Sequence, residues 1–284
     1  METNVTSVNG TVVDTPKIRS VWYFTFEFLK LVCALASIIS NYVLIYAIVK
    51  LRKKDLLHFY VLLWCIFTSL FMVLSPITNL VTNKELMFPI EVDGEVWCPI
   101  YELEWSILIT SFVLMTFVSN DWFITNFFKG FHEYCNQKAV LVKIIICVLI
   151  CITILFSQVS CLSEDDFEHN NSLMYNIITM VLIVVTQQCL KLYYSYRHGK
   201  ELDQGLGISL PAIFVLSWLP FLLYMPLHKY SEVEYAVLCY LNLLRYLIAD
   251  CNSIFNVVYL AITEPDYRKA MQEAIWCTYC NCFL

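Results

Sequence analysis

The chain has 284 residues, of which 59% are hydrophobic and only 15% charged, and its formal net charge is −6. A soluble domain is nearer half apolar and a quarter charged, so this composition excludes an ordinary water-soluble domain and indicates a membrane protein. One polytopic membrane domain is expected to account for the chain, since no repeated or low-complexity segment interrupts it.

The first 20 residues form a polar N-terminal segment without the basic-then-apolar layout of a cleavable signal peptide. This segment carries glycosylation sequons at Asn4 and Asn9, and a third sequon stands at Asn170. Sequons arise by chance, so each is weak alone. All three fall on the side of the membrane that the loop charges predict to be extracellular.

Seven apolar stretches are each long enough to cross a bilayer, which takes about 20 residues. In chain order they are Val21–Val49, Leu57–Val81, Trp97–Phe127, Lys138–Ser160, Leu173–Tyr196, Gly207–Leu227 and Tyr235–Ile262. Pro265 then favours the first turn of a short amphipathic surface helix, Asp266–Met271. The predicted fold is an all-α membrane protein, a seven-helix transmembrane bundle over residues 21–262 with a short eighth helix and a Cys-rich tail over residues 263–284.

The basic residues of the loops predict the orientation of these helices. With the N-terminus outside, most of them fall on the cytoplasmic side: Lys50, Arg52, Lys53, Lys54, Lys129, Lys138, Lys143, Lys191, Arg197, Lys200, Arg268 and Lys269. The outer side keeps only Lys17, Arg19, Lys84 and Lys229. Because cytoplasmic loops carry an excess of basic residues, we expect the N-terminus outside the cell and the C-terminus in the cytoplasm.

Acidic residues gather on the predicted outer face, within residues 85–95, 164–168 and 232–234. Such residues can simply keep the outer loops hydrated. They can also create a field that attracts a cationic ligand or a basic peptide. Both interpretations stay open.

The last two apolar stretches each contain a polar or proline-bearing motif. Residues 214–221 read FVLSWLPF and residues 252–259 read NSIFNVVY. The first resembles F-x-x-C-W-x-P-F and the second resembles N-S-x-x-N-P-x-x-Y, with Val257 in place of the proline. These are motifs of the last two transmembrane helices of the rhodopsin-like G-protein-coupled receptors, so the chain is similar to a divergent member of that family.

The resemblance implies conformational-switch roles for Asn41, Asp121, Trp122, Phe214, Trp218, Pro220, Asn252, Asn256 and Tyr259. A tryptophan beside a proline kink can merely fill the bundle, but the family places a rotamer-sensitive residue there, beneath the ligand pocket. The two asparagines and Tyr259 are expected to link helix seven to helices one, two and three. Without a proline at position 257, helix seven is expected to be straighter than in relatives.

Two further segments resemble the family but depart from it at informative positions. Residues 40–44 resemble G-N-x-x-V around Asn41, but Ser69 stands where the family usually has a sodium-binding aspartate. Asp121-Trp122-Phe123 resembles D-R-Y, with Trp122 in place of the arginine and Phe123 in place of the tyrosine. In the family this arginine holds helix three to helix six in the inactive state. Tryptophan cannot form a charge-assisted bond, so that contact is expected to be missing. The expected result is weak or constitutive signalling that is insensitive to sodium.

The cysteines fall into two informative groups. Cys98 opens the third helix and Cys161 follows the fourth, and two cysteines in outer loops tend to pair in an oxidising compartment. The resemblance implies the same disulfide. Cys277, Cys280 and Cys282 follow the surface helix and are palmitoylation candidates, whereas Asn281 stands where a prenylation motif needs cysteine.

Charged residues inside apolar helices are pocket candidates by default, because they are costly there. With Trp218, the candidates are Glu102, Glu104, Arg245 and Asp250. Glu104 could bind a ligand cation or pair with Arg245. Glu102 and Glu104 could also simply reach the headgroup layer.

The sequence therefore predicts a cell-surface receptor that transduces an extracellular ligand of unknown class, with a cationic one as one option, to a heterotrimeric G protein or arrestin. Segment Phe128–Tyr134 is expected to be the main loop for that contact, and Trp64, outside every motif, to face lipid or serve packing. One alternative is an atypical, constitutively active, scavenging or viral receptor homologue, which Trp122 and Ser69 favour. Another is a transporter or channel, although no inverted repeat supports it. Membrane lipid is an expected partner, whereas no enzymatic activity, metal, cofactor or nucleic-acid partner is predicted.

Overall fold

The computed structural model describes residues 15–52, 55–82, 94–160, 166–198, 206–230, 244 and 247–281, and every regular element in these ranges is a helix. The helices are α1 (Thr15–Lys50), α2 (Leu56–Thr82), α3 (Gly94–Phe127), α4 (Lys129–Gln137), α5 (Ala139–Ser160), α6 (Asp166–His198), α7 (Leu206–Tyr230), α9 (Asn252–Thr263) and α10 (Pro265–Asn281). The predicted all-α architecture is confirmed for this part of the chain.

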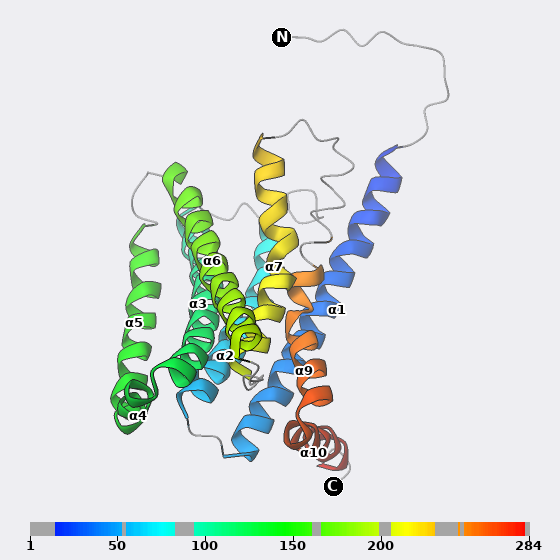
Figure 1. Cartoon of the computed structure of the whole chain (residues 1–284). Coiled ribbons are helices and arrows are strands. Elements are labelled where there is room, and N and C mark those ends of the chain that lie inside the picture. The colour runs from blue at the N-terminus through cyan, green and yellow to red at the C-terminus, as the bar shows by residue number, and fades with distance from the viewer. Residues whose placement is uncertain are drawn as a thin grey trace.

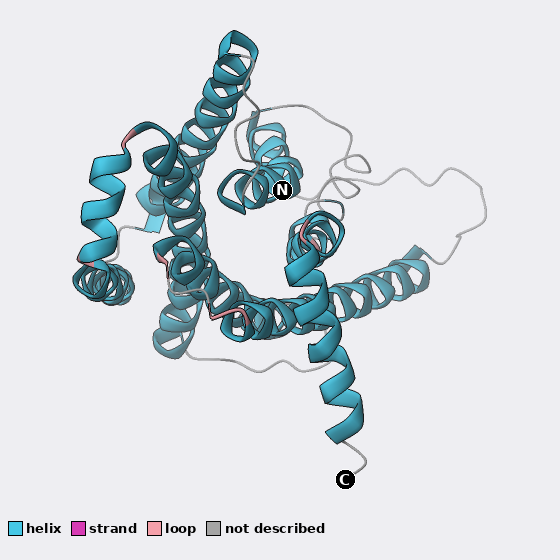
Figure 2. Cartoon of the chain, turned by 60° about the horizontal axis from the view of Figure 1, so that its bottom comes forward, coloured by secondary structure: helices cyan, strands magenta, loops and turns pink. Residues whose placement is uncertain are grey.

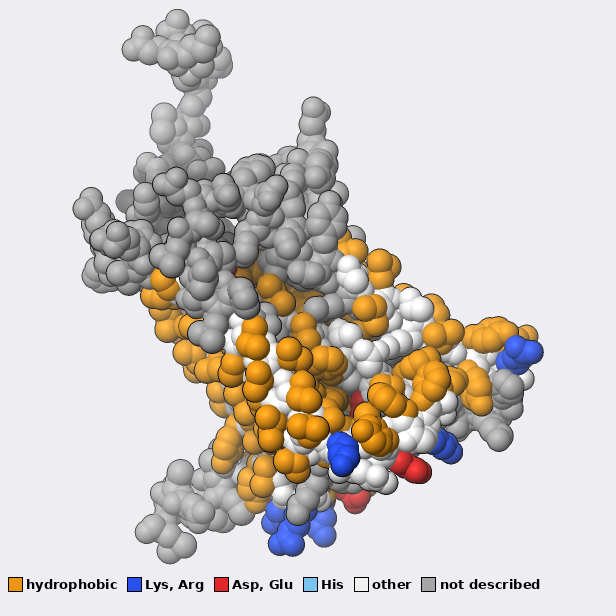
Figure 3. Space-filling model, turned by 90° about the vertical axis from the view of Figure 1, so that its left-hand side faces the viewer, with side chains coloured by type: hydrophobic (Ala, Val, Ile, Leu, Met, Phe, Trp, Pro, Cys, Tyr) orange, Lys and Arg blue, Asp and Glu red, His pale blue; other side chains and the backbone are white. Residues whose placement is uncertain are grey.

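Three helices contain a segment that is long and apolar enough to cross a membrane, namely Thr25–Lys50, Leu56–Thr78 and Glu102–Phe127. A fourth span results if α4 and the first part of α5 are counted as one bent segment. Figure 3 shows one face on which hydrophobic side chains cover a broad band, with Lys and Arg gathered below it. The protein is therefore a multi-pass membrane protein with three or four candidate spans among the described residues.

The central helix of the bundle is α3, which contacts α2, α4, α5, α6 and α7. On the other side, α1 packs against α2, α9 and α10, and α7 lies between α3 and α9. Figure 1 shows α5 at one edge of the bundle and α1 at the opposite edge. Both α4 and α10 lie at the same end, which we call the α10 end.

The segment Phe128–Tyr134, expected to be a loop, instead forms most of α4, so that expectation is wrong. A break at Lys138 turns α4 by 82° from α5, and no residue of α4 is buried. Phe128, Phe131 and Tyr134 are between 56% and 59% exposed. A helix with exposed aromatic residues that crosses the end of a membrane bundle is suited to the membrane–water interface.

The predicted last transmembrane helix, Tyr235–Ile262, is described only from its residues 244 and 247 onward, and it is irregular at Cys251, which has ψ −2°. The carbonyl of the preceding Asp250 accepts a hydrogen bond from the Ser37 hydroxyl on α1. Past this point α9 runs unbroken through Val257, as expected without a proline. Helical hydrogen bonds continue across this position, from the Cys251 N–H to Leu247 and from the Phe255 N–H to Cys251, and a helix straighter than in relatives stays a prediction.

The eighth helix is longer than predicted, since α10 extends from Pro265 to Asn281. Its Arg268 side chain donates to the carbonyls of Ala261 at 2.5 Å and Ile262 at 2.7 Å, and so caps the end of α9. Figure 2, which brings the α10 end forward, shows the helix that leads to the C-terminus running outward from the bundle. This position matches the predicted surface helix.

Two contacts hold α10 against the end of α1 and the start of α2. Lys50 forms an ion pair with Glu273 at 2.8 Å, and the hydrogen bond from Lys50 lowers the pKa of the Glu273 carboxyl. Tyr267 stacks on His58 with ring centroids 6.3 Å apart, and burial raises the pKa of its phenol. Asp55 caps α2 by accepting from the His58 backbone N–H at 3.3 Å, and it also contacts the His58 ring.

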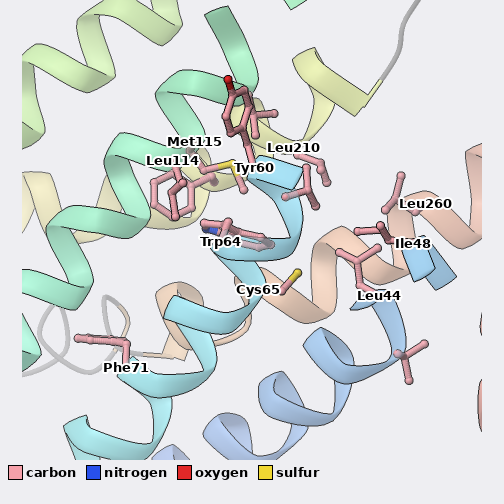
Figure 4. Close-up of a cluster of buried hydrophobic side chains, with 14 of the residues drawn as sticks. Leu44, Ile48, Tyr60, Trp64, Cys65, Phe71, Leu114, Met115, Leu210 and Leu260 are labelled. Carbon is pink, nitrogen blue, oxygen red and sulfur yellow. The ribbon is translucent and has the colours of Figure 1, made fainter. Parts of the chain in front are cut away.

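The buried core runs along the middle of α2 and α3. Figure 4 shows Trp64 and Cys65 of α2 among buried side chains that include Leu114 and Leu210. Trp64 is 0% exposed. The lipid-facing alternative that the sequence left open for Trp64 is therefore wrong, and this residue is a central packing element.

Candidate functional site

Five aromatic side chains from three helices form the centre of the candidate site. We call Trp64 and Phe71 of α2, Phe112 of α3, and Phe214 and Trp218 of α7 the aromatic cluster. The Trp218 ring centroid lies 5.1 Å from that of Phe112, 6.1 Å from that of Phe214 and 6.4 Å from that of Phe71. Edge-to-face packing of this kind is directional, so a rotation of Trp218 requires its neighbours on α2 and α3 to repack.

Within the aromatic cluster, Phe214 of α7 contacts rings of both other helices. Its ring centroid lies 4.7 Å from that of Phe112 at an interplanar angle of 72°, and 6.3 Å from that of Trp64 at 84°. Trp218 itself is only 5% exposed. The resemblance-based placement of Phe214 and Trp218 inside the bundle is consistent with this geometry.

A part-buried acid lies nearer the opposite end of the bundle, away from α10. Glu104 on α3 accepts a hydrogen bond from Thr78 on α2 at 2.5 Å and a second from Ser75. Thr78 is seven positions beyond Phe71 on the same helix, which corresponds to about 10 Å at 1.5 Å per residue. The carboxyl group therefore lies about two helical turns from the aromatic cluster, joined to α2 through hydroxyl groups.

A second charged group connects α1 with the segment before α9. Lys30 is buried and forms an ion pair with Glu27 at 2.8 Å, and its ammonium lies 4.7 Å from the Phe26 ring centroid. Asp250 is also buried and interacts electrostatically with Lys30 and Glu27. The sequence analysis selected Asp250 but missed Lys30 and Glu27, although a charge pair three positions apart in an apolar helix is a recognisable signal.

The predicted asparagines of helices one and seven are buried; Asn41 bonds to a neighbouring helix, whereas the described hydrogen bond of Asn256 stays within its own helix. Asn41 donates to the hydroxyls of Thr68 and Ser69, each at 3.0 Å, so α1 is tied to α2 where the family has an aspartate. Asn256 donates to Asn252 at 3.4 Å within α9 itself.

Six buried polar atoms have no protein hydrogen-bond partner within the described residues: Asn41 Oδ1, His58 Nε2, Trp64 Nε1, Ser253 Oγ, Asn256 Oδ1 and Tyr267 Oη. Buried water commonly satisfies groups of this kind.

Tyr259 does not link α9 to helices one, two or three in the described contacts. Its hydroxyl lies 2.7 Å from the Ser209 hydroxyl on α7. It also follows Asn256 by three positions, whereas the tyrosine of the family motif follows by four. The expected equivalence of Tyr259 with the family tyrosine is wrong, because one residue moves a helical side chain by about 100°.

At the α10 end, Trp122 is buried at 5% exposure and its ring meets that of Phe127 with centroids 6.3 Å apart. The adjacent Asp121 interacts electrostatically with His132 of α4 and with Asp55 and His58 near the start of α2. Ser119 and Asn120 both contact the Gln187 side chain of α6. This end of α3 therefore has polar partners on three sides and an aromatic residue towards α7.

Several predicted site residues lie outside the described residues: Asn4, Asn9, Cys161, Arg245 and Cys282. Cys98 lies near the start of α3, Asn170 near the start of α6, Cys277 and Cys280 near the end of α10, Glu102 on α3 and Pro220 on α7. The pairing of Glu104 with Arg245, the glycosylation sites and the palmitoylation sites stay predictions.

The Cys98–Cys161 disulfide is expected to form in protein isolated from the cell surface. Peptide mapping without reductant should find the linked pair, and mapping after reduction should find the two separate peptides. Removing such a bond should cost roughly 2–5 kcal/mol, because it constrains the unfolded chain. Free thiols at both positions in folded protein would contradict the assignment.

A scan against protein-family models finds no match for this chain. A search of curated proteins finds no relative. The functional argument therefore rests on the residues themselves. Their arrangement is suited to conformational coupling: the acid near one end and the aromatic cluster in the middle share α2 and α3, and the aromatic cluster and the contacts at the other end share α3 and α7.

Proposed function

We propose that the chain is a divergent rhodopsin-like receptor, with seven membrane spans, an extracellular N-terminus and a location in the plasma membrane. In this proposal an extracellular ligand binds near Glu104 and shifts the arrangement of the helices. The shifted arrangement then binds a heterotrimeric G protein or arrestin at the α10 end. The observation that carries the proposal is the contact of Trp218 with Phe71 and Phe112, which joins three helices below a part-buried acid.

The part-buried carboxyl favours a ligand with a cationic group. Glu104 is held by Thr78 and Ser75, two neutral hydroxyl groups, so its charge is not cancelled by those partners. A ligand ammonium would supply the opposite charge, and a charge-assisted hydrogen bond in a low dielectric is strong. The acidic stretches of the predicted outer loops would assist by attracting the same cations.

Cells that express the full chain provide the test. Recruitment of G proteins and arrestin would be measured first without ligand and then with amine and peptide libraries. Glu104→Gln should abolish the response to an active amine at unchanged surface level. The proposal assigns the cation to Glu104 and not to the other acidic candidate, Glu102, because residues two positions apart on a helix point about 200° apart. Glu102→Gln should therefore preserve the response. Absence of recruitment under every condition, with the protein at the surface, would exclude a signalling receptor.

An atypical receptor is the second candidate, because Trp122 replaces the family arginine and Ser69 replaces the family aspartate. It shares the fold but responds weakly to ligand or signals without one. High basal recruitment that no ligand changes would favour this candidate. Ion currents or substrate uptake in place of recruitment would favour a channel or transporter.

A further inference from the structure

The first turn of α7 approaches α3 too closely for any side chain at Gly207. A Cβ atom added at Gly207 would lie 2.5 Å from Trp122 Cβ and 3.2 Å from the carbonyl oxygen of Val118. Carbon atoms in contact are normally about 3.5–4.0 Å apart. The backbone of α7 therefore rests directly on α3 at Trp122, and this contact depends on glycine.

The next two residues each hold α7 to a different helix. The Ile208 carbonyl accepts a hydrogen bond from Gln188 Nε2 of α6 at 3.0 Å. The Ser209 hydroxyl lies 2.7 Å from the Tyr259 hydroxyl of α9. Because successive residues of a helix point about 100° apart, three consecutive positions can reach three neighbours.

We propose that Gly207, Ile208 and Ser209 form a latch that holds the first turn of α7 against α3, α6 and α9. Gly207 and Ser209 are positioning residues, since they set where α7 stands rather than bind a ligand. The contact of Gly207 with Trp122 takes the place of the arginine contact that Trp122 cannot make. In a receptor of the proposed kind, on which this role rests, release of the latch opens the α10 end to its intracellular partner.

The latch changes the expectation drawn from Trp122 alone. A missing arginine predicted raised basal opening, but close packing at Gly207 supplies another closing contact. The closing contact is steric and neutral, so it is weakened by one added methyl group rather than by salt. We therefore expect the wild-type protein to have low basal opening and a Gly207 variant to have high basal opening.

The test is hydrogen–deuterium exchange on the intact protein in lipid nanodiscs, comparing Gly207→Ala with Gly130→Ala. Gly130 is the matched control, because an added Cβ there meets nothing within 4 Å. Overpacking of this type shifts an equilibrium by about tenfold or more. Gly207→Ala should raise exchange in residues 210–217, whose backbone N–H groups other than at Pro211 are bonded within α7, by about that factor, with α1 unchanged. Gly130→Ala should match the wild type.

Equal exchange in the wild type, Gly207→Ala and Gly130→Ala would overturn the proposal. If Gly207→Ala raises exchange in every helix, the milder variants Ser209→Ala and Tyr259→Phe decide. Each should raise exchange in residues 210–217 alone, and the double variant should add nothing, because both changes remove the same hydroxyl contact. No change in either variant would overturn the latch.

Recruitment assays on the same variants separate the latch from the receptor proposal. Raised exchange together with raised basal recruitment in Gly207→Ala supports both. Raised exchange without recruitment in any condition keeps the latch as a property of the bundle and counts against a signalling receptor. Raised recruitment without raised exchange counts against the latch alone.

Discussion

Replacing Trp64 with alanine is expected to destabilise the protein by about 3–5 kcal/mol, the range for deleting a large buried aromatic side chain. Trp64 is 0% exposed and its ring packs against Phe214 at an angle of 84°. Helix association in a membrane depends on close packing rather than on the hydrophobic effect, so a cavity at this position removes contacts that lipid cannot replace.

The measurement is the temperature at which purified protein loses its monodisperse state after heating. Phe28→Ala is the control. Phe28 is 59% exposed on α1, so its replacement should lower the melting temperature only slightly. Trp64→Phe should recover much of the loss, because it refills the site and removes the buried Nε1 donor that has no protein partner within the described residues. Equal melting of Trp64→Ala and Phe28→Ala would show that the core does not depend on this ring.

Trp218→Ala is expected to change signalling by about tenfold or more, in basal level or in the ligand concentration for half-maximal response, a typical size for coupling between sites. Trp218 is the one α7 residue of the aromatic cluster whose ring meets both Phe71 of α2 and Phe112 of α3. Without this ring, a change near Glu104 loses a direct packing route to α7.

Leu216→Ala is the matched control for Trp218→Ala, because Leu216 lies two positions away on α7 and is 66% exposed. Recruitment of G protein or arrestin would be normalised to the amount of each variant at the cell surface. A normalised response to ligand that is the same in wild type, Trp218→Ala and Leu216→Ala would reduce Trp218 to a packing residue.

Helix positions were the most predictable feature of this chain. The stretches Leu57–Val81 and Lys138–Ser160 agree with α2 and α5 within a residue or so at each end. Long apolar runs that end at polar residues permit few alternatives in a membrane, because every backbone polar group must be paired inside the segment. The segment of α4 was missed because it is short and lacks the length of a span.

The direction in which each side chain points was much less predictable. Trp64 and Leu216 both stand in apolar helices, yet one is buried and the other is exposed. Lipid is as apolar as a protein core, so hydrophobic periodicity separates the two faces of a membrane helix poorly. For the same reason the sequence left open whether Trp64 faces lipid or serves packing.

Contacts between distant residues depended on the packing of whole helices. Tyr259 reaches Ser209 across 50 positions of sequence, and Gly207 meets Trp122 across 85. The motif at residues 252–259 suggested different partners, because it omits one position of the family spacing. A shift of one residue is small in sequence, but on a helix it selects another neighbour.

Composition and the length of the apolar runs are enough to predict an all-helical multi-pass membrane protein, because both are local properties and a helix must be long and apolar enough to cross the bilayer. The sequence also singled out Trp218, Asn41 and Asn256, since polar and aromatic residues with special spacing stand out in an apolar background. The burial of Trp64 in the core and the contact of Gly207 with Trp122 follow from the packing of the helices and could not be read from the sequence. These facts depend on the distance between helices, which is set by the sum of many side-chain contacts and appears in no single segment.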